Sequence, residues 1–417
     1  MVQTFWSDVL SCLNKSSPLK KVLFLLYFSF FTFHFSFSQD SCSLRITLLT
    51  CAPGEELYST FGHTALRVQD SSTGIDAVYN YGTFEFSPDF YSKFIRGKLL
   101  YSLSVEDFRD FLYTYQIESR SIVEQELRLS CAEKERLYKA LQVNALEQNR
   151  YYRYDFLFDN CTTRARDMVA QNTDSPVVFK NILPAQPPTF RNLIHSYLNA
   201  GNAYWSKLGI DMLLGVKLDA QVTNEQAMFL PDYLLKGLDS ALVTNQPLVT
   251  PPQPVLQMPA LFAKGSFFTP LVLFSLLFVA VAILSLTRSK RIRKALKIFD
   301  RLFFSLLGLA GLLLLFMWFG TDHVVCQNNY NLLWALPTHI VLPFLLYKNA
   351  EGLRRYFIIV FWLSVLLLLT WFFLPQQMNA ALVPIILLII HRSWLLSKKS
   401  VYGTKRNYPS RQKTVLP

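Results

Sequence analysis

Cys161 is the residue best placed to do chemistry, because it stands where a helix is expected to begin. Asp159 and Asn160, directly before it, are residue types that cap helix N-termini, and a run with helical character follows. A thiol at such a position ionises more easily than a free side chain, since unpaired N–H groups and aligned peptide dipoles favour the thiolate. The alternatives are a small apolar residue that packs the first turn, or one half of a disulfide.

A cysteine nucleophile needs a base to take its proton and a polar group to hold that base in the useful tautomer. His63 and Asn80 can fill these roles, because they lie on the two arms of a predicted β-hairpin with its turn at 70–74. If the turn holds a two-residue loop, His63 faces Asn80 across the ladder with Cβ atoms roughly 5 Å apart. A slip of one residue would put Tyr79 or Tyr81 opposite instead.

The elements around these residues predict an α+β domain over residues 39–246. Besides the hairpin, strands are expected at 44–50 and 123–129, the second alternating between apolar and polar residues. Residues 104–107 and 130–133 both resemble helix N-termini, and the second contains a full capping box. Sheet and helices together can position three distant side chains at one site.

Composition separates this domain from the rest of the chain. The 417 residues are 51% hydrophobic, with the apolar excess concentrated in the last third. The net charge of +12 is equally uneven, because residues 39–266 hold 21 Lys and Arg against 25 Asp and Glu, a net of −4. The basic excess therefore reports membrane topology and gives no argument for a nucleic-acid partner.

The chain before and after the domain has its own signals. Residues 1–38 read as a secretory signal peptide, with an uncleaved membrane anchor as the alternative. Prolines make 247–266 a stiff linker, which is expected to end the exported domain. A basic cytoplasmic tail is expected at 398–417.

Five apolar segments predict an all-α transmembrane domain of five helices over 267–397. The segments are 267–286, 302–319, 332–347, 356–374 and 380–390. The loops at 287–301 and 348–355 carry Lys and Arg, whereas those at 320–331 and 375–379 carry none. Since positive loops stay in the cytoplasm, the tail is predicted inside and the N-terminal domain outside, across a bacterial inner membrane. Arg392 is expected to snorkel from the last span.

Several further residues could contact a substrate. Asp322 and His323 lie in the 320–331 loop, on the same side of the membrane as the Cys161 domain, where they would bring part of the site to the lipid surface. Arg164 and Tyr81 are weaker candidates, because residues of this kind also form solvated helix faces or cores. The metal-binding patterns CxxC, HExxH and HxE are missing, so neither metal nor cofactor is expected, and His195 is assigned to a helix surface.

Three motifs carry a resemblance to a known family: 48–68 (LLTCAPGEELYSTFGHTALRV), 79–84 (YNYGTF) and 159–163 (DNCTT). They resemble the Lnb N-terminal periplasmic domain family, in which such a domain precedes five transmembrane helices. The order His63, Asn80, Cys161 also resembles permuted papain-like and NlpC-like cysteine enzymes. This second resemblance implies a permuted papain-like core.

Together these features predict a membrane-anchored, exported cysteine hydrolase or acyltransferase that acts on an amide or ester in the cell envelope. Cys161 would be the nucleophile, His63 the base and then the acid, and N–H groups at the helix start would stabilise the oxyanion. The alternative is a non-catalytic envelope module for binding or assembly, built from the same fold. Membrane lipid is the expected partner, and Cys51 is expected to pair with Cys42 or Cys131, since export permits disulfides.

Overall fold

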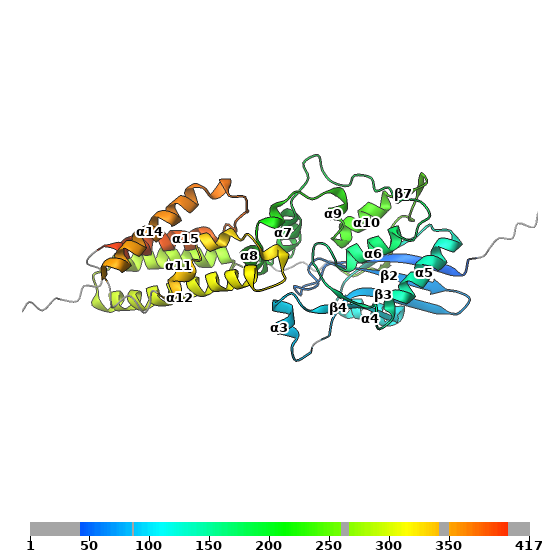
Figure 1. Cartoon of the computed structure of the whole chain (residues 1–417), viewed down its shortest axis with the longest axis horizontal. Coiled ribbons are helices and arrows are strands. Elements are labelled where there is room, and N and C mark those ends of the chain that lie inside the picture. The colour runs from blue at the N-terminus through cyan, green and yellow to red at the C-terminus, as the bar shows by residue number, and fades with distance from the viewer. Residues whose placement is uncertain (1–41, 86, 260–266, 342–349, 399–417) are drawn as a thin grey trace, which may run out of the picture. The chain divides into compact units, whose positions relative to one another are not determined.

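A computed structural model describes residues 42–85, 87–259, 267–341 and 350–398 of the chain (Figure 1). The predicted signal peptide, or anchor, at 1–38 lies outside the described residues, as does the predicted basic tail apart from Lys398. The described chain divides by composition and secondary structure into an α+β part, followed from about residue 267 by a helical part.

A seven-stranded sheet organises the α+β part. The strands run in the order β6-β4-β3-β2-β1-β5-β9, and every neighbouring pair is antiparallel. They are β1 (Leu44–Cys51), β2 (His63–Asp70), β3 (Ile75–Thr83), β4 (Leu100–Asp107), β5 (Ile122–Glu126), β6 (Tyr151–Arg153) and β9 (Gln253–Leu256). The predicted strands at 44–50 and 123–129 are confirmed as β1 and β5, although β5 is shorter.

The β2–β3 hairpin is present, but its predicted register is wrong by two residues. Asp70 pairs with Ile75 and Leu66 with Tyr79, so the loop holds four residues instead of two. Because side chains alternate with period two, this shift keeps His63 and Asn80 on the same face and makes them diagonal neighbours. The predicted contact therefore survives the error in register.

Strand β4 was not predicted. Residues 104–107 were expected to start a helix, yet they continue β4, and the helix α4 (Phe108–Ile117) begins after the N-cap Asp107. Ser and Asp are common both at caps and at strand ends, so local residue type could not separate the two.

Helices cover both faces of the sheet. Phe108, Phe111 and Tyr115 of α4 pack with apolar side chains of β1, β2 and β3 on one face. On the other face lie α5 (Cys131–Ala145) and α6 (Cys161–Ala170), and the Thr162 hydroxyl of α6 donates to Thr64 of β2 at 3.2 Å. Figure 1 shows α5 and α6 together on one side of β2 and β3, with α4 on the other.

The predicted linker at 247–266 is folded chain in its first half. β9 pairs with β5 as the last strand of the sheet, and Val249 bridges to Leu127. Pro254 is tolerated there because an edge strand has one side that needs no N–H donor. The exported domain thus extends past residue 246, to at least β9.

A second apolar cluster lies beside the sheet and is built from short helices. Its elements are α7 (Phe190–Ala200), α8 (Tyr204–Leu213), η2 (Val216–Asp219), α9 (Asn224–Ala227) and α10 (Pro231–Asp239). The assignment of His195 to a helix surface is wrong. His195 is buried, because α7 packs against α8 and the imidazole binds Asp211 at 2.8 Å.

The helical part contains α11 (Pro270–Ser285), α12 (Lys290–Phe319), α14 (Ala350–Leu369) and α15 (Leu382–Ser397). Among the described residues, α12 and α14 are long and apolar enough to cross a membrane, and α11 and α15 are shorter apolar helices. The described portion of the third predicted span forms the short turns η4 (Tyr330–Leu333) and η5 (Pro337–Ile340). Residues 342–349, which complete that span, lie outside the described residues.

Arg392 does not snorkel to the interface. Its side chain is 1% exposed and binds the Asp300 carboxylate of α12 through two nitrogens, at 2.6 and 2.7 Å. A buried charge needs an opposite partner, and that partner was missed because the basic loop before 302 was read as solvated chain.

Candidate active site

Cys161 occupies the first position of α6, as predicted. Asn160 is the N-cap: its Oδ1 accepts from the N–H groups of Thr162 and Thr163, both at 2.9 Å. Its Nδ2 donates to the carbonyls of Phe156 and Phe229 at 2.9 and 2.8 Å. A single buried amide therefore fixes the helix start to two flanking segments and sets the position of the thiol.

His63 and Asn80 come together beside this thiol. The Cys161 thiol and the His63 imidazole share a hydrogen bond, and the N–H of Thr64 also donates to the sulfur. His63 Nε2 lies 2.6 Å from Asn80 Oδ1, which leaves Nδ1 for the cysteine. The three residues named from the sequence thus form one chain of contacts.

Glu106 extends this chain and was not identified from the sequence. Its carboxylate accepts from Asn80 Nδ2 at 3.1 Å. Because an ionised carboxylate only accepts, it fixes the amide of Asn80 with Oδ1 toward His63. Oδ1 in turn requires a proton on Nε2, so Nδ1 of the neutral ring is the free base. Glu106 could have been identified from the sequence only by recognising β4, because β4 places it on the strand next to that of Asn80.

Gly82 brings β3 close to the thiol. The pairing of β3 with β4 shifts between Tyr81 and Thr83, and Gly82 lies at this bulge with φ of +89°. A Cβ at Gly82 would stand 3.5 Å from the Cβ of Cys161. Glycine suits the left-handed backbone of this bulge, and even an added Cβ would meet Cys161 only at ordinary contact distance.

The electrostatics of the site favour the thiolate. Burial would raise the pKa of Cys161, but the adjacent His63 charge and the hydrogen bonds from His63, Thr64 and Thr162 lower it to about 7. For His63, burial lowers the pKa, yet the thiolate and the hydrogen bonds with Cys161 and Asn80 raise it overall. Each group therefore stabilises the charged form of the other.

Cys51 is a nearby thiol with the opposite properties. It is free and fully buried in β1, and burial raises its pKa to about 12 despite a hydrogen bond with Tyr115. The predicted disulfide of Cys51 is therefore wrong: Cys42 and Cys131 are the disulfide-bonded residues. Local sequence could not decide this, because β1 places Cys51 inside the core.

The thiol opens onto a cavity of about 760 Å³. His63, Asn80, Glu106 and Cys161 line one part of it. Most of the remaining wall is apolar, and includes Leu57, Phe61, Phe84, Phe94, Leu99, Phe111, Tyr154, Phe156, Leu157, Ile194, Ile210, Leu214, Leu218, Phe229 and Leu230. Such a cavity suits a ligand with an extended apolar portion.

The weaker candidates divide into two groups. Asp322 and His323 line the cavity; His323 Nε2 lies 2.9 Å from the carbonyl of Phe94, and the Asp322 carboxylate pairs with Arg153 at 3.5 Å. Arg164 and Tyr81 do not line it. Arg164 forms a two-nitrogen ion pair with Asp159 and lies 3.5 Å from the centre of the Tyr152 ring, and the Tyr81 hydroxyl donates to Asn144 at 2.6 Å.

Arg120 is a cavity cation that the sequence did not single out. Its side chain is 6% exposed, pairs with Glu118 at 2.7 Å and donates to the carbonyl of Ala52 at 2.8 Å. Within the described ranges, His, Cys, Asp and Glu form no group that could hold a metal ion.

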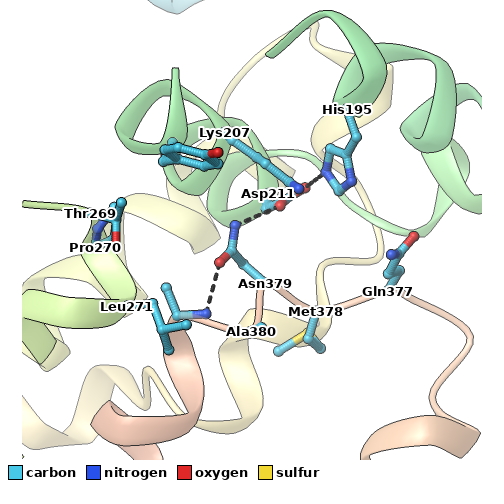
Figure 2. Close-up of a pocket in the computed structure, with 12 residues that line it drawn as sticks. His195, Lys207, Asp211, Thr269, Pro270, Leu271, Gln377, Met378, Asn379 and Ala380 are labelled. Carbon is cyan, nitrogen blue, oxygen red and sulfur yellow. Dashed lines mark hydrogen bonds and ion pairs between the residues drawn. The ribbon is translucent and has the colours of Figure 1, made fainter. Parts of the chain in front are cut away.

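A second histidine centre lies away from this cavity, around a smaller pocket of about 300 Å³ (Figure 2). Asp211 Oδ1 accepts from Arg191 and His195, and its Oδ2 accepts from Asn379, each at 2.8 Å. No cysteine or serine lines the pocket in the part of the chain that the structure describes. Its polar atoms bind one another, and they join α7 and α8 to the chain before α15.

The fold and the site define an exported α+β domain with a Cys–His–Asn centre, followed by a helical membrane domain. Comparison with protein families agrees: residues 34–196 match the Lnb N-terminal periplasmic domain, and residues 263–401 match the Lnb transmembrane domain. The chain therefore carries an Lnb N-terminal periplasmic domain followed by an Lnb transmembrane domain. No curated protein and no solved structure showed a significant match.

Proposed function

We propose that the protein is a membrane-anchored cysteine acyltransferase or hydrolase that cleaves an ester or amide of a lipid-linked acyl group. The observation that carries this proposal is the contact chain Cys161–His63–Asn80–Glu106 at the wall of a large apolar cavity. Peptidoglycan amides, another class of substrate in a cell envelope, are polar and fit this lining poorly.

In the first step, the Cys161 thiolate attacks the carbonyl carbon of the acyl donor. The protonated His63 gives its proton to the leaving oxygen or nitrogen as that bond breaks, and an acyl thioester remains on Cys161. A water or an amine then loses a proton to His63 and attacks the thioester, which releases the acyl product and restores the thiolate–imidazolium pair. Water as acceptor gives hydrolysis, and an amine gives transfer.

The sequence suggested that the N–H groups at the helix start stabilise the oxyanion. Not all of them can do so. Those of Thr162 and Thr163 already donate to Asn160. The N–H of Cys161 itself, at the first position of α6, is the group we assign to the oxyanion.

The arrangement of the chain supports a permuted papain-like core. A helix that starts with the nucleophile packs on an antiparallel sheet, and the base and its partner come from two adjacent strands. In the chain, His63 and Asn80 precede Cys161, whereas the papain order is Cys, His, Asn; a circular permutation relates the two orders. This assignment rests on the arrangement alone, since no solved structure matches the chain.

We assign the membrane to the bacterial inner membrane, with the tail in the cytoplasm. Five crossings are the number that places the basic loops and the tail on one side and the exported domain on the other.

The test uses the full chain in lipid nanodiscs and a long-chain acyl ester carrying an alkyne. The expected result is an alkyne label on Cys161 that hydroxylamine removes, as a thioester requires. Cys161→Ala abolishes the label and the release of the alcohol, whereas Cys51→Ala, at a free buried thiol of β1, keeps both. Label that persists in Cys161→Ala, or no label on a folded wild-type chain with any acyl ester, would overturn the enzyme proposal in favour of a binding module.

A further inference from the structure

Residues 90–100 form a short surface segment that is both aromatic and basic. It consists of α3 (Phe90–Ile95) and the turn that leads into β4. Tyr91 is 71% exposed, Phe94 49% and Leu100 51%, so the segment presents apolar side chains to its surroundings. We call it the basic-aromatic segment.

The same segment carries three exposed cations, Lys93, Arg96 and Lys98. Lys93 pairs with Asp89 at 2.7 Å, which leaves the segment with an excess of positive charge. Aromatic and aliphatic side chains interleaved with Lys and Arg are the composition of chain that lies in a membrane interface, with the rings among the acyl chains and the cations at the headgroups.

Hydrogen bonds attach this segment to the end of a membrane helix. α12 ends at Phe319, and three residues later the N–H of Asp322 donates to the carbonyl of Arg96 at 3.0 Å. His323 Nε2 lies 2.9 Å from the carbonyl of Phe94. Gly97, with φ of +69°, allows the close approach, because a Cβ there would stand 3.3 Å from atoms of Asp322 and His323. The apolar end of α12 therefore sets the segment at the membrane boundary.

The inner side of the segment belongs to the cavity of Cys161. Phe94, Gly97 and Leu99 line that cavity together with Asp322 and His323. The segment is thus shared by two surfaces, one that faces outward with exposed apolar and basic side chains and one that faces the thiol.

We propose that the basic-aromatic segment inserts into the outer face of the bilayer, binds anionic phospholipid and forms the lipid entrance to the cavity. The contact of the segment with the bilayer does not depend on the proposed function. Its role as an entrance rests on that function. The occupant is a bilayer lipid, since the segment is tied to the loop where a membrane helix ends.

Photocrosslinking tests the contact independently of catalysis. Benzoylphenylalanine replaces Tyr91 or, as a control, Val178, which is 59% exposed elsewhere on the exported domain. Both variants carry Cys161→Ala and are reconstituted into vesicles of phosphatidylcholine with or without phosphatidylglycerol, each lipid bearing an alkyne. Tyr91→benzoylphenylalanine is expected to capture several times more lipid than Val178→benzoylphenylalanine, and more when phosphatidylglycerol is present.

The charge contribution has its own control. Lys93→Gln, Arg96→Gln and Lys98→Gln together are expected to remove the preference for phosphatidylglycerol, whereas Lys134→Gln, Lys139→Gln and Lys180→Gln, which remove the same charge elsewhere, leave it in place. Equal lipid capture at Tyr91 and Val178, or capture of a second copy of the chain at Tyr91, overturns the proposal. Because every arm lacks the nucleophile, these outcomes are independent of whether Cys161 is reactive.

Discussion

Two histidine centres in this molecule use similar parts for different ends. At the first, His63 Nε2 lies 2.6 Å from an amide oxygen, and the other side of the ring meets a thiol at the wall of a large cavity. At the second, His195 Nε2 lies 2.8 Å from the carboxylate of Asp211, to which Asn379 also donates (Figure 2). Arg191 binds the same carboxylate. An imidazole held in one orientation is common to both, half-buried at His63 and buried at His195.

The difference lies in whether the hydrogen-bonded chain ends on a reactive group. In the Asp211 centre the carboxylate accepts from three donors, and Arg191 also binds Asp219 and two carbonyls. These polar groups therefore stabilise the packing of the helices. In the Cys161 centre the chain of contacts ends on a nucleophile. An oriented histidine therefore indicates catalysis only when a reactive atom stands at its second nitrogen.

Substitution of each histidine in turn is the strongest test of the difference between the two centres. His63→Ala is expected to lower acyl release by roughly 10²–10⁴-fold, the usual contribution of a general base, and to leave the chain folded. His195→Gln, which keeps a donor for Asp211, should leave turnover within a few fold. Turnover and thermal unfolding of both variants are measured in the same nanodiscs. Equal losses of turnover in two folded variants would contradict the distinction.

The second prediction reverses the roles. Arg191→Met leaves the carboxylates of Asp211 and Asp219 buried without their main cation, and should lower the free energy of unfolding by about 3–5 kcal/mol. The control is Arg164→Met, which breaks the half-exposed pair with Asp159 and should cost about 0–1 kcal/mol from the ion pair. Denaturant unfolding measures both. A loss at Arg191 no larger than at Arg164 would show that the Asp211 centre does not hold the structure together.

The third prediction concerns pH at two free thiols, Cys161 at the start of α6 and Cys51 in β1. A pKa of about 7 makes the Cys161 thiolate the major form above pH 7, so its alkylation by iodoacetamide should rise through that pH and level off above it. Cys51, with a pKa of about 12, should stay unreacted. His63→Ala removes the charge that lowers the Cys161 pKa, and should slow alkylation at pH 7 by about tenfold or more, since one pKa unit is tenfold. An unchanged pH profile of alkylation in His63→Ala would contradict the ion pair between Cys161 and His63.

The smallest effect is expected one contact further out. Glu106→Gln keeps the size of the side chain but can present a donor to Asn80, so the Asn80 amide is expected to turn and to stop fixing the His63 tautomer. Turnover should fall by a few fold with the alkylation profile shifted to higher pH, whereas Glu118→Gln, which lies on the same cavity beside Arg120, leaves the profile unchanged. Identical alkylation profiles in the two variants would show that Glu106 lines the cavity without orienting Asn80 and His63.

Local sequence was sufficient wherever a short-range rule decides the structure. The helix start at Cys161 follows from its cap, the hairpin from its turn, and the same-face position of His63 and Asn80 from strand alternation, which survived a register error of two residues. The helical membrane domain was predicted from the sequence for the same reason, because apolar length is a local quantity.

Only the tertiary structure decided which groups share a space. Glu106 joins the site because β4 lies beside β3, Cys51 is sealed because β1 runs through the middle of the sheet, and His195 is buried because α7 meets α8. Arg392 and Asp300, ninety-two positions apart, are partners for the same reason. Pairing across the fold depends on strand order and helix packing, which are sums over many distant contacts and leave no signature at any one residue.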